Sequence, residues 1–340
     1  MKTRRAYVEL EYNGVNITHD LASDLKTFTY TDNAGGAADD VAIEISDAKR
    51  KWISNWMFDK GDTFTANIVT VNWRKDGEKK RLPCGFFVVD EPEYSGRPSV
   101  ISLNGISVPA SSNFMNLKRS KSWKNITIKA IASDIAARYK LQLFFDSKLN
   151  PSFKDKAQKD ESDAAFLQKL CEDEGFSLKV TDKQIIVFRE VEYEAKKVVA
   201  TFREDDSSVT GYSFKTTYTN TAYAGVRLTY FDSKTKKTIK YLYATKEIDE
   251  EKDRIHKINR RVANEEEAER LAKNTLRKLN KKETQATLEL VGDTRLLSSS
   301  TIDLIGFGSF DGKYYIDKAV HSLAGYKTTL ELHKVLKGGY

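Results

Sequence analysis

The strongest constraint on the fold is a change in hydrophobic period along the chain. From residue 1 to about 115, segments such as AYVELEYNG and GFFVVDEPEY alternate apolar with polar residues and are rich in β-branched and aromatic side chains. The same alternation returns from about 198 onward, for example in TQATLELV and KYYIDKAVHS. Alternation places successive side chains on opposite faces of a strand. We therefore predict two β regions, the first with a hairpin turn at Asp76-Gly77 and one short helix within 47–57.

The stretch from about 116 to 197 has a helical period instead. Its first helix is indicated by apolar residues that recur on one face: Ile128, Ile131, Ala132, Ile135 and Tyr139. The segment LQLFFD follows this helix, and the segments FSLKV and QIIVF are predicted to form a β-hairpin. These features predict a small α/β module between the two β regions.

The segment ESDAAFLQKLCEDEGF, residues 161–176, has five carboxylates around one cysteine. Such a cluster is either an active site or the polar side of a packing helix. Its apolar residues share one helical face: Phe166, Leu167, Leu170 and Cys171. Ser162 or Asp163 is placed to cap the N-terminus, and Gly175 is placed to end the helix. The Cys171 thiol then points inward, where burial raises its pKa and makes it unreactive. We predict a packing helix whose acids face water or an interface.

A longer helix is expected inside the second β region. Asn264 is a good N-cap residue, and Glu267 follows three positions later, as in a capping box. The apolar side of this helix is formed by Ala268, Leu271, Ala272, Thr275, Leu276 and Leu279. We predict a surface helix that covers a barrel.

The two β regions share a short motif. GFFVVD at Gly85 to Asp90 and GKYYID at Gly312 to Asp317 both read glycine, any residue, aromatic, apolar, β-branched, aspartate. Each motif is followed by another glycine and a further strand. The match indicates that the two β regions arose by duplication.

Catalytic motifs are missing from the sequence. The four histidines, His19, His256, His321 and His333, form no HExxH motif and no zinc-type spacing with cysteine. GFGSFDG at 306–312 lacks the lysine of a phosphate loop, and no GxSxG elbow occurs. We predict no catalytic, cofactor-binding or metal-binding residues, and hence no enzyme.

Charge and aromatic content raise one further possibility, a nucleic-acid-binding protein. The net charge is +7, but 56 basic and 49 acidic residues are interspersed and form no basic block. Aromatic residues between 212 and 243 lie among lysines and arginines, so stacking of single-stranded bases is conceivable. Their alternation favours packing and interfaces instead. No specific nucleic acid is expected as a partner.

The two cysteines, Cys84 and Cys171, lie far apart in the sequence and indicate reduced thiols rather than a disulfide framework. The N-terminus MKTRRAYVEL leads into a strand without the apolar region of a signal peptide, and no apolar run reaches the ~20 residues of a membrane span. A cytoplasmic protein without a membrane anchor is expected.

Four segments together resemble the baseplate-hub proteins of contractile tails: the phage late control D family, PBSX-type XkdQ proteins and the N-terminal half of VgrG. These segments are 39–64, 84–105, the 161–176 helix with its following QIIVF strand, and 292–335. The residues that carry the resemblance are Glu161, Ser162, Asp163, Phe166, Leu167, Gly175, Phe176, Gly85, Asp90, Gly312, Tyr315 and Asp317. All are expected to be structural.

The resemblance implies a mainly β fold with an α+β insertion, in which two tube-like β-barrel domains, 1–115 and 198–340, flank a small α/β module, 116–197. It implies a non-enzymatic homotrimer that adapts a six-fold tail tube to a three-fold spike. Its partners would be the tube protein, a separate spike protein and baseplate wedge proteins, in a phage or phage-like particle assembled in the bacterial cytoplasm. The alternatives are a hub with cell-wall hydrolase activity, a non-contractile tail-tip protein and a soluble nucleic-acid-binding barrel protein.

Overall fold

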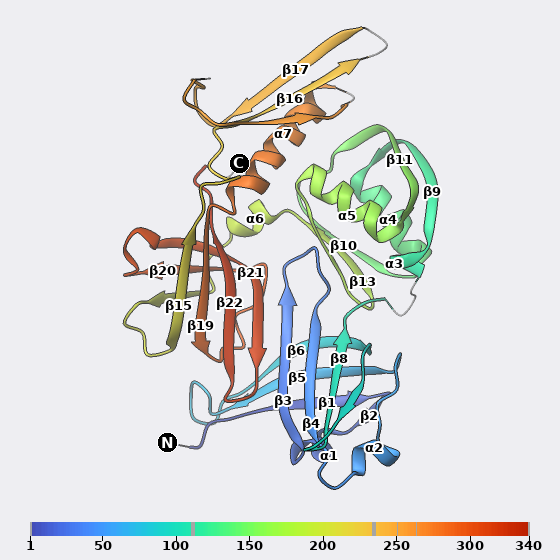
Figure 1. The fold of residues 1–340 in the computed structure, drawn as a ribbon, viewed down its shortest axis with the longest axis vertical. Helices are drawn as coiled ribbons and strands as arrows, with labels where there is room; N and C mark the ends of the chain where they lie inside the picture. The colour runs from blue at the N-terminus through green and yellow to red at the C-terminus, as the bar shows by residue number, and fades with distance from the viewer. Residues whose placement is uncertain (1, 110–112, 233–235, 250, 263, 339–340) are drawn as a thin grey trace.

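The computed structural model describes residues 2–109, 113–232, 236–249, 251–262 and 264–338. The described chain is mainly β, as predicted, and strands from both β regions join in one 14-stranded sheet (Figure 1). Three smaller sheets complete the fold. No helix in the described ranges combines the length and hydropathy needed to cross a membrane.

The predicted first β region supplies eight strands of the large sheet. They are β1 (Arg5–Tyr12), β2 (Val15–Asn16), β3 (Leu25–Asn33), β4 (Asp40–Ser46), β5 (Thr63–Val71), β6 (Lys79–Val89), β7 (Glu93–Ser95) and β8 (Val100–Ile106). Two short helices accompany them, α1 (Thr18–Ala22) and α2 (Lys51–Asn55). The predicted hairpin at Asp76-Gly77 is confirmed, since β5 and β6 pair antiparallel on either side of it.

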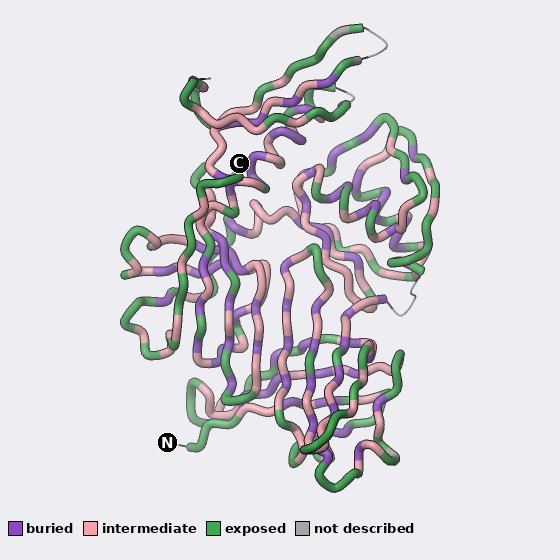
Figure 2. The backbone as a smooth tube through the Cα atoms, in the orientation of Figure 1, coloured by how far each residue is buried: buried purple, intermediate pink, exposed green. Residues whose placement is uncertain are grey.

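The second β region supplies the other six strands. They are β14 (Ala200–Arg203), β15 (Val209–Thr216), β19 (Thr284–Val291), β20 (Thr301–Ile305), β21 (Gly312–Ser322) and β22 (Lys327–Lys334). A 3₁₀ turn, η1 (Gly308–Phe310), lies between β20 and β21. Two apolar cores underlie the large sheet (Figure 2): one is formed by the first region together with Tyr326, and the other by the second region alone.

Eight strands stand in a row that we call the wall: β15, β19, β22, β21, β3, β4 and β8, with β7 beyond β8. Figure 1 shows β19, β22, β21, β3 and β4 side by side in this row. Phe28 and Tyr30 of β3 are buried on the core side of the wall, whereas Thr29 and Thr31 lie on its other, partly exposed side. The wall therefore has one apolar face and one polar face.

The two regions meet inside the wall where β21 pairs antiparallel with β3, from Lys318 opposite Asn33 to Ser322 opposite Thr29. We call this contact the internal joint. The indole Nε1 of Trp73 donates a hydrogen bond to the Gly292 carbonyl at 2.6 Å, and Arg74 forms an ion pair with Asp293. These contacts also tie the first region to the second.

Strand order repeats between the two regions. The neighbours β3-β4-β8-β6-β5 of the first region correspond to β15-β19-β22-β21-β20 of the second, and the correspondence also follows chain order. The last strands differ, because β1 is antiparallel to β5 whereas β14 is parallel to β20.

Register repeats as well. Gly85 lies opposite Ala66 and Gly312 lies opposite Leu304, and both glycines have a positive φ. Residues at equal distances after these two glycines have corresponding partners in the next strand. Val88 lies opposite Ile106, as Tyr315 lies opposite His333. Tyr94 lies opposite Ile101, as His321 lies opposite Thr328. Even a register shift is shared, since one falls after Leu25 in β3 and another after Val209 in β15. The two motifs recognised in the sequence thus occupy corresponding places in the sheet.

The predicted middle module comes after a short helix, α3 (Asn113–Asn116). Its elements are β9 (Lys118–Thr127), α4 (Ile128–Arg138), β10 (Gln142–Asp146), β11 (Ser152–Ser162), α5 (Asp163–Glu174), β12 (Ser177–Val180), β13 (Gln184–Phe188) and α6 (Glu190–Glu194). Both predicted helices and the β12–β13 hairpin are confirmed. The β9–β11 pair was not predicted, because its charged strands are largely exposed and carry little alternation.

An arm, residues 223–282, projects from the second β region (Figure 1). It contains β16 (Gly225–Asp232), β17 (Lys237–Ala244), β18 (Ile255–Asn259) and α7 (Glu265–Asn280). The Asn264 side chain accepts a hydrogen bond from the Glu267 amide at 2.9 Å, as the capping pattern predicts. The prediction that this helix covers a barrel is wrong: Leu271 and Leu276 pack on the small sheet of the arm.

Candidate assembly interface

Helix α5 is the packing helix predicted from its spacing. The Ser162 hydroxyl accepts a hydrogen bond from the Ala165 amide at 3.2 Å, and Gly175 ends the helix with φ 75°. Phe166 stacks on Trp123 with ring centroids 5.2 Å apart. The residues of the predicted stripe, together with Phe176, are buried in one core: Phe166, Leu167, Leu170 and Cys171. Burial raises the pKa of the Cys171 thiol, which fits an unreactive side chain.

The prediction that the acids of this helix face water or an interface is wrong for Asp163, which is 0% exposed and has its hydrogen-bond partners inside the middle module. Its carboxylate accepts hydrogen bonds from Arg138 at 2.6 and 2.8 Å and from Tyr139 at 2.6 Å. Burial alone would raise the pKa of Asp163, but hydrogen bonds from Tyr139, Gln158 and Arg138 outweigh it and lower the pKa. Asp163 is therefore a buried anchor between α4 and α5.

Glu174, at the other end of α5, is also buried and not solvent-facing, with 3% exposure. Arg270 of α7 donates to its carboxylate at 2.9 Å, but desolvation is the larger effect and raises the pKa of Glu174. Nearby, the Asn274 side chain donates to the Asp173 carbonyl at 3.1 Å, and a Cβ at Gly175 would collide with that asparagine. This end of the helix is thus an internal interface with the arm. Glu161, by contrast, is only half-buried, at the end of β11.

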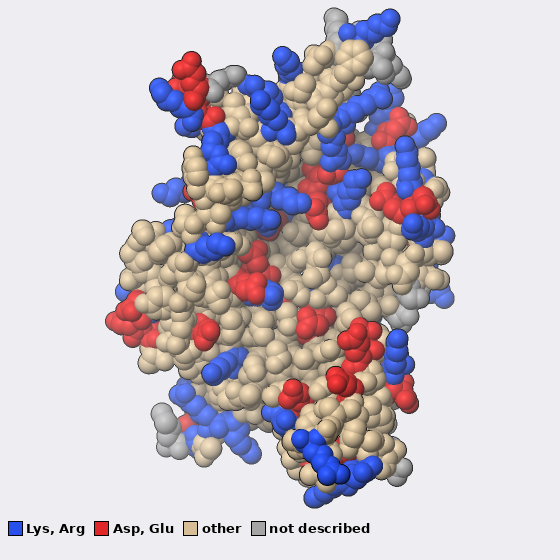
Figure 3. Space-filling view, viewed as in Figure 1, with Lys and Arg blue, Asp and Glu red and all other residues tan. Residues whose placement is uncertain are grey.

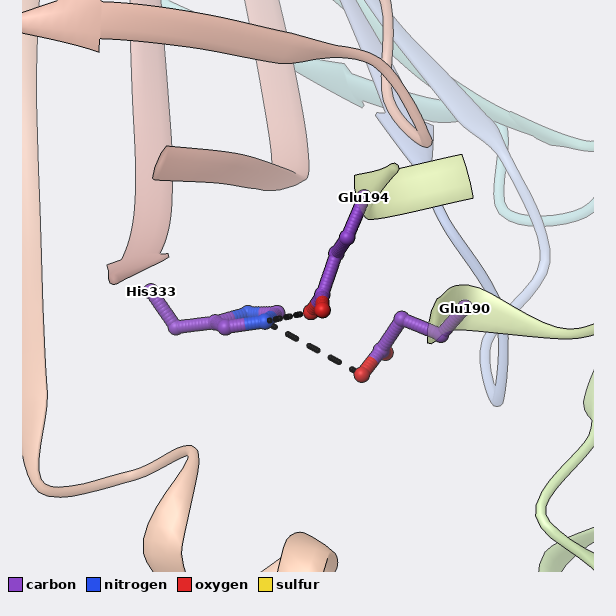
Figure 4. Close-up of side chains that lie close together, drawn as sticks. All are labelled: Glu190, Glu194 and His333. Carbon is purple, nitrogen blue, oxygen red and sulfur yellow. Dashed lines mark hydrogen bonds and ion pairs between the residues drawn. The ribbon is translucent and has the colours of Figure 1, made fainter. Parts of the chain in front are cut away.

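A second group of titratable side chains comes from four separate elements: Glu190 and Glu194 of α6, Asp317 of β21, His333 of β22, and Arg277 and Lys281 at the end of the arm helix. Figure 4 shows both glutamates directed toward His333. Nε2 of His333 lies 2.9 Å from Glu194, and Nδ1 lies 2.7 Å from Asp317. Three carboxylates thus face three basic groups.

Neighbouring charges favour the charged forms of His333 and Glu190. Burial would lower the pKa of His333, but Asp317 and Glu194 outweigh it and raise the pKa to about 9. Burial would raise the pKa of Glu190, but the charges of Lys281, His333 and Arg277 lower it to about 2. His333 is therefore protonated at neutral pH.

The atoms of Glu190, Glu194 and His333 that could ligate a metal lie within 4.8 Å of one another. However, Arg277 already donates to Glu190 at 3.0 Å and to Glu194 at 2.6 Å. A cation would have to displace this guanidinium. The geometry fits an ion-pair network that ties α6, α7 and β22 together. The sequence spacing did not predict this ion-pair network, because its residues come from distant segments of the chain.

The remaining motif residues lie on β6, directly after it at Asp90, and on β21. The Asp90 amide donates to the Asn104 carbonyl at 2.9 Å, and the Asp317 carbonyl accepts from the Ala34 amide at 2.9 Å. Tyr315 is buried, with its ring 5.1 Å from the His333 ring. The structure therefore separates the predicted residues into two sets, one on α5 and one in the two corresponding strands.

Both lateral ends of the wall present strand edges. Among the described strands, β15 pairs only with β19, and β7 pairs only with β8. The exposed residues on these strands include Lys215 and Ser213 on β15 and Glu93 and Ser95 on β7. Open strand edges are pairing surfaces for another chain unless they are protected. These two edges are the candidate assembly interface.

The arm offers little support for nucleic-acid binding. Lys and Arg side chains predominate at the end of the molecule that carries it (Figure 3). Several of them are engaged, since Lys246 binds Asp253 and Arg260 binds Asp173. Tyr241 and Tyr243 pack toward α7 and are not free to stack bases. On the outer side, Phe231 is 63% and Leu242 41% exposed.

Comparison with known proteins gives one family model, described as phage tail baseplate hub, that matches residues 58–326. Over 181 residues the chain is 29% identical to a protein of Escherichia phage 186 named as a probable baseplate hub protein. This match covers 53% of the chain and 44% of the relative, so the matched part spans less than half of the relative's length.

Two solved structures share the fold over most of the chain. A tail protein from Neisseria meningitidis MC58 has a TM-score of 0.71 at 13% identity, with coverage of 97% of this chain and 96% of that one. An E. coli component of the type VI secretion system, described as similar to tail proteins of bacteriophage T4, has a TM-score of 0.57 at 11% identity, with coverage of 93% and 75%.

Proposed function

Because the chain belongs to the phage tail baseplate hub family, as its sequence resemblance indicated, we propose that it is the structural hub of a phage or phage-like contractile particle. In this role it forms a homotrimer that adapts a six-fold tail tube to a three-fold spike. The tube protein, a separate spike protein and baseplate wedge proteins are its partners. Assembly takes place in the cytoplasm of the bacterial host.

The repeated register of the two β regions carries this proposal. Residues 1–115 and 198–340 each form one tube-like barrel unit, with the middle module, 116–197, between them. Three chains then present six corresponding units in a ring. A ring of this kind needs head-to-tail contacts that close after a fixed number of copies. Corresponding strand order and register supply similar edges at every step.

The burial and hydrogen-bond partners of the cysteines and histidines support a structural role without catalysis. Both cysteines are buried, and burial raises the pKa of each thiol. His321 lies within hydrogen-bonding distance of Tyr326 and Leu296, and His333 belongs to the ion-pair network. The hub with hydrolase activity, the non-contractile tail-tip protein and the nucleic-acid-binding barrel remain the alternatives.

Deletion of the gene from cells that produce the particle tests this function. We expect no complete particles, and we expect a plasmid-borne wild-type copy to restore them, because sheath and tube assembly would lack the adaptor at their base. The purified chain should not hydrolyse peptidoglycan. Normal particles from the deletion strain would contradict the hub. Peptidoglycan cleavage that a single carboxylate substitution abolishes would favour the hydrolase alternative.

A further inference from the structure

The internal joint provides a template for contacts between chains. In it, Tyr30 of β3 lies opposite His321 of β21, and the two buried rings stack at 6.2 Å with an interplanar angle of 19°. Thr31 lies opposite Val320 and Thr29 opposite Ser322 on the polar side of the wall. The joint thus has an aromatic pair on its core side and small side chains on its polar side.

The repeated register identifies the strands that correspond to this joint at the ends of the wall. Phe214 of β15 lies opposite Ala286 just as Tyr30 of β3 lies opposite Val41. Tyr94 of β7 lies opposite Ile101 just as His321 of β21 lies opposite Thr328. Therefore β15 corresponds to β3, and β7 corresponds to the second part of β21. In the internal joint the two corresponding strands are paired, whereas β15 and β7 each have an open edge among the described strands.

We propose that β15 of one copy pairs antiparallel with β7 of the next copy and reproduces the internal joint between chains. The template sets the register: Phe214 opposite Tyr94, Lys215 opposite Glu93, and Ser213 opposite Ser95. This inference rests on the proposed ring of three chains. It goes beyond that ring because it names the strand edges and the residue pairs that close it.

The register follows from the repeated strand pairing alone, and the side chains that it places opposite each other are chemically complementary. Phe214 and Tyr94 both pack against the apolar cores, so they form an aromatic pair on the side where Tyr30 and His321 stack. Lys215 and Glu93 are exposed and carry opposite charges. Opposite charges and aromatic pairs directly across an antiparallel ladder are stabilising.

The proposed joint between chains lacks side-chain hydrogen bonds that stabilise the internal joint. Asp32 of β3 accepts hydrogen bonds from Ser298 and from Lys179, but its counterpart on β15 is Thr216, which has no carboxylate. Fewer ties make the contact between chains weaker, so assembly of the free protein depends on its concentration.

Cysteine cross-linking of the full-length protein tests the register. Directly opposite residues in an antiparallel ladder have Cα atoms about 4.5–5.5 Å apart, which suits a disulfide. Under mild oxidation, Ser95→Cys/Ser213→Cys should give a covalent trimer that reduction releases. Cys84 and Cys171 are buried and will not compete. The control Ser95→Cys/Thr210→Cys carries its second thiol on the same exposed strand but three residues out of register, and it should cross-link at least tenfold less.

Charge reversal gives an independent reading of the same contact. Lys215→Glu and Glu93→Lys should each weaken self-association roughly fivefold per joint, because like charges then face each other across the ladder. The double variant should recover wild-type association, measured by sedimentation. Equal cross-linking of both cysteine pairs, no covalent trimer from the in-register pair, or no recovery in the double variant would overturn the proposal.

The outcomes separate this joint from the hub function. If Ser95→Cys/Ser213→Cys restores particles to the deletion strain but forms no disulfide in purified protein or particles, the joint is wrong and the hub stands. If the covalent trimer forms but the deletion strain makes normal particles without the gene, the joint stands and the hub function is wrong.

Discussion

Phe166→Asp is expected to unfold the middle module, with a loss of at least about 4 kcal/mol in its free energy of unfolding. Truncation of a buried phenylalanine alone costs about 3–5 kcal/mol, and an unpaired charge in the cavity adds a desolvation penalty. Phe166 is 5% exposed and stacks on Trp123. The loss is measured by urea unfolding, followed by circular dichroism and by tryptophan fluorescence, to which Trp123 is the one contributor from this module.

Two controls accompany this variant. Lys169→Asp places an aspartate on the exposed side of the same helix and should change the unfolding free energy by about 0.5 kcal/mol or less. Cys171→Ser changes one atom in the core and should be milder than Phe166→Asp. If Phe166→Asp melts like wild type while Cys171→Ser prevents assembly, the assignment of the helix face is wrong and the thiol is functional.

Lys179→Met is expected to cost about 3–5 kcal/mol, because it leaves two buried carboxylates without their counterion. The Lys179 ammonium lies 2.6 Å from Asp32 and 2.9 Å from Asp39, and all three side chains are largely buried. This contact fastens β12 of the middle module to β3 beside the internal joint. The measurement is the unfolding free energy as a function of pH.

The sign of the pH dependence follows from Asp39. Burial raises its pKa to about 6, although Lys179 acts in the opposite direction. A carboxyl with a raised pKa in the folded state costs stability above that pKa and is relieved as protonation proceeds below it. Without the ammonium the cost of the ionised form grows, so the deficit should be largest near pH 8 and shrink below about pH 6. Lys183→Met, an exposed lysine on the same hairpin, should show almost no deficit at either pH. A deficit independent of pH would contradict this account.

Local patterns in the sequence were sufficient for much of the fold. The stripes of α4, α5 and α7, the Ser162 and Asn264 caps and the Gly175 terminus all depend on neighbours within one helical turn, and the structure has each of them. Most alternating segments form strands as predicted. The charged strands β9 and β11 were missed because both of their faces are largely exposed.

Contacts between distant segments could not be predicted in this way. Asp163 and Glu174 are buried because Arg138 and Arg270 reach them from other helices, which spacing within α5 does not reveal. The network around His333 gathers side chains from the middle module, the arm and β22. The Gly85–Asp90 and Gly312–Asp317 repeat did mark corresponding strands, but the open edges that follow from it required the register of the whole sheet.

A cryo-EM reconstruction of the assembled particle tests the central claim most directly. We expect a ring of three chains in which residues around Gly85–Asp90 and Gly312–Asp317 alternate at six superposable positions, with β15 of each chain beside β7 of the next. Six chains in the ring, or two β regions that occupy non-equivalent positions, would contradict it.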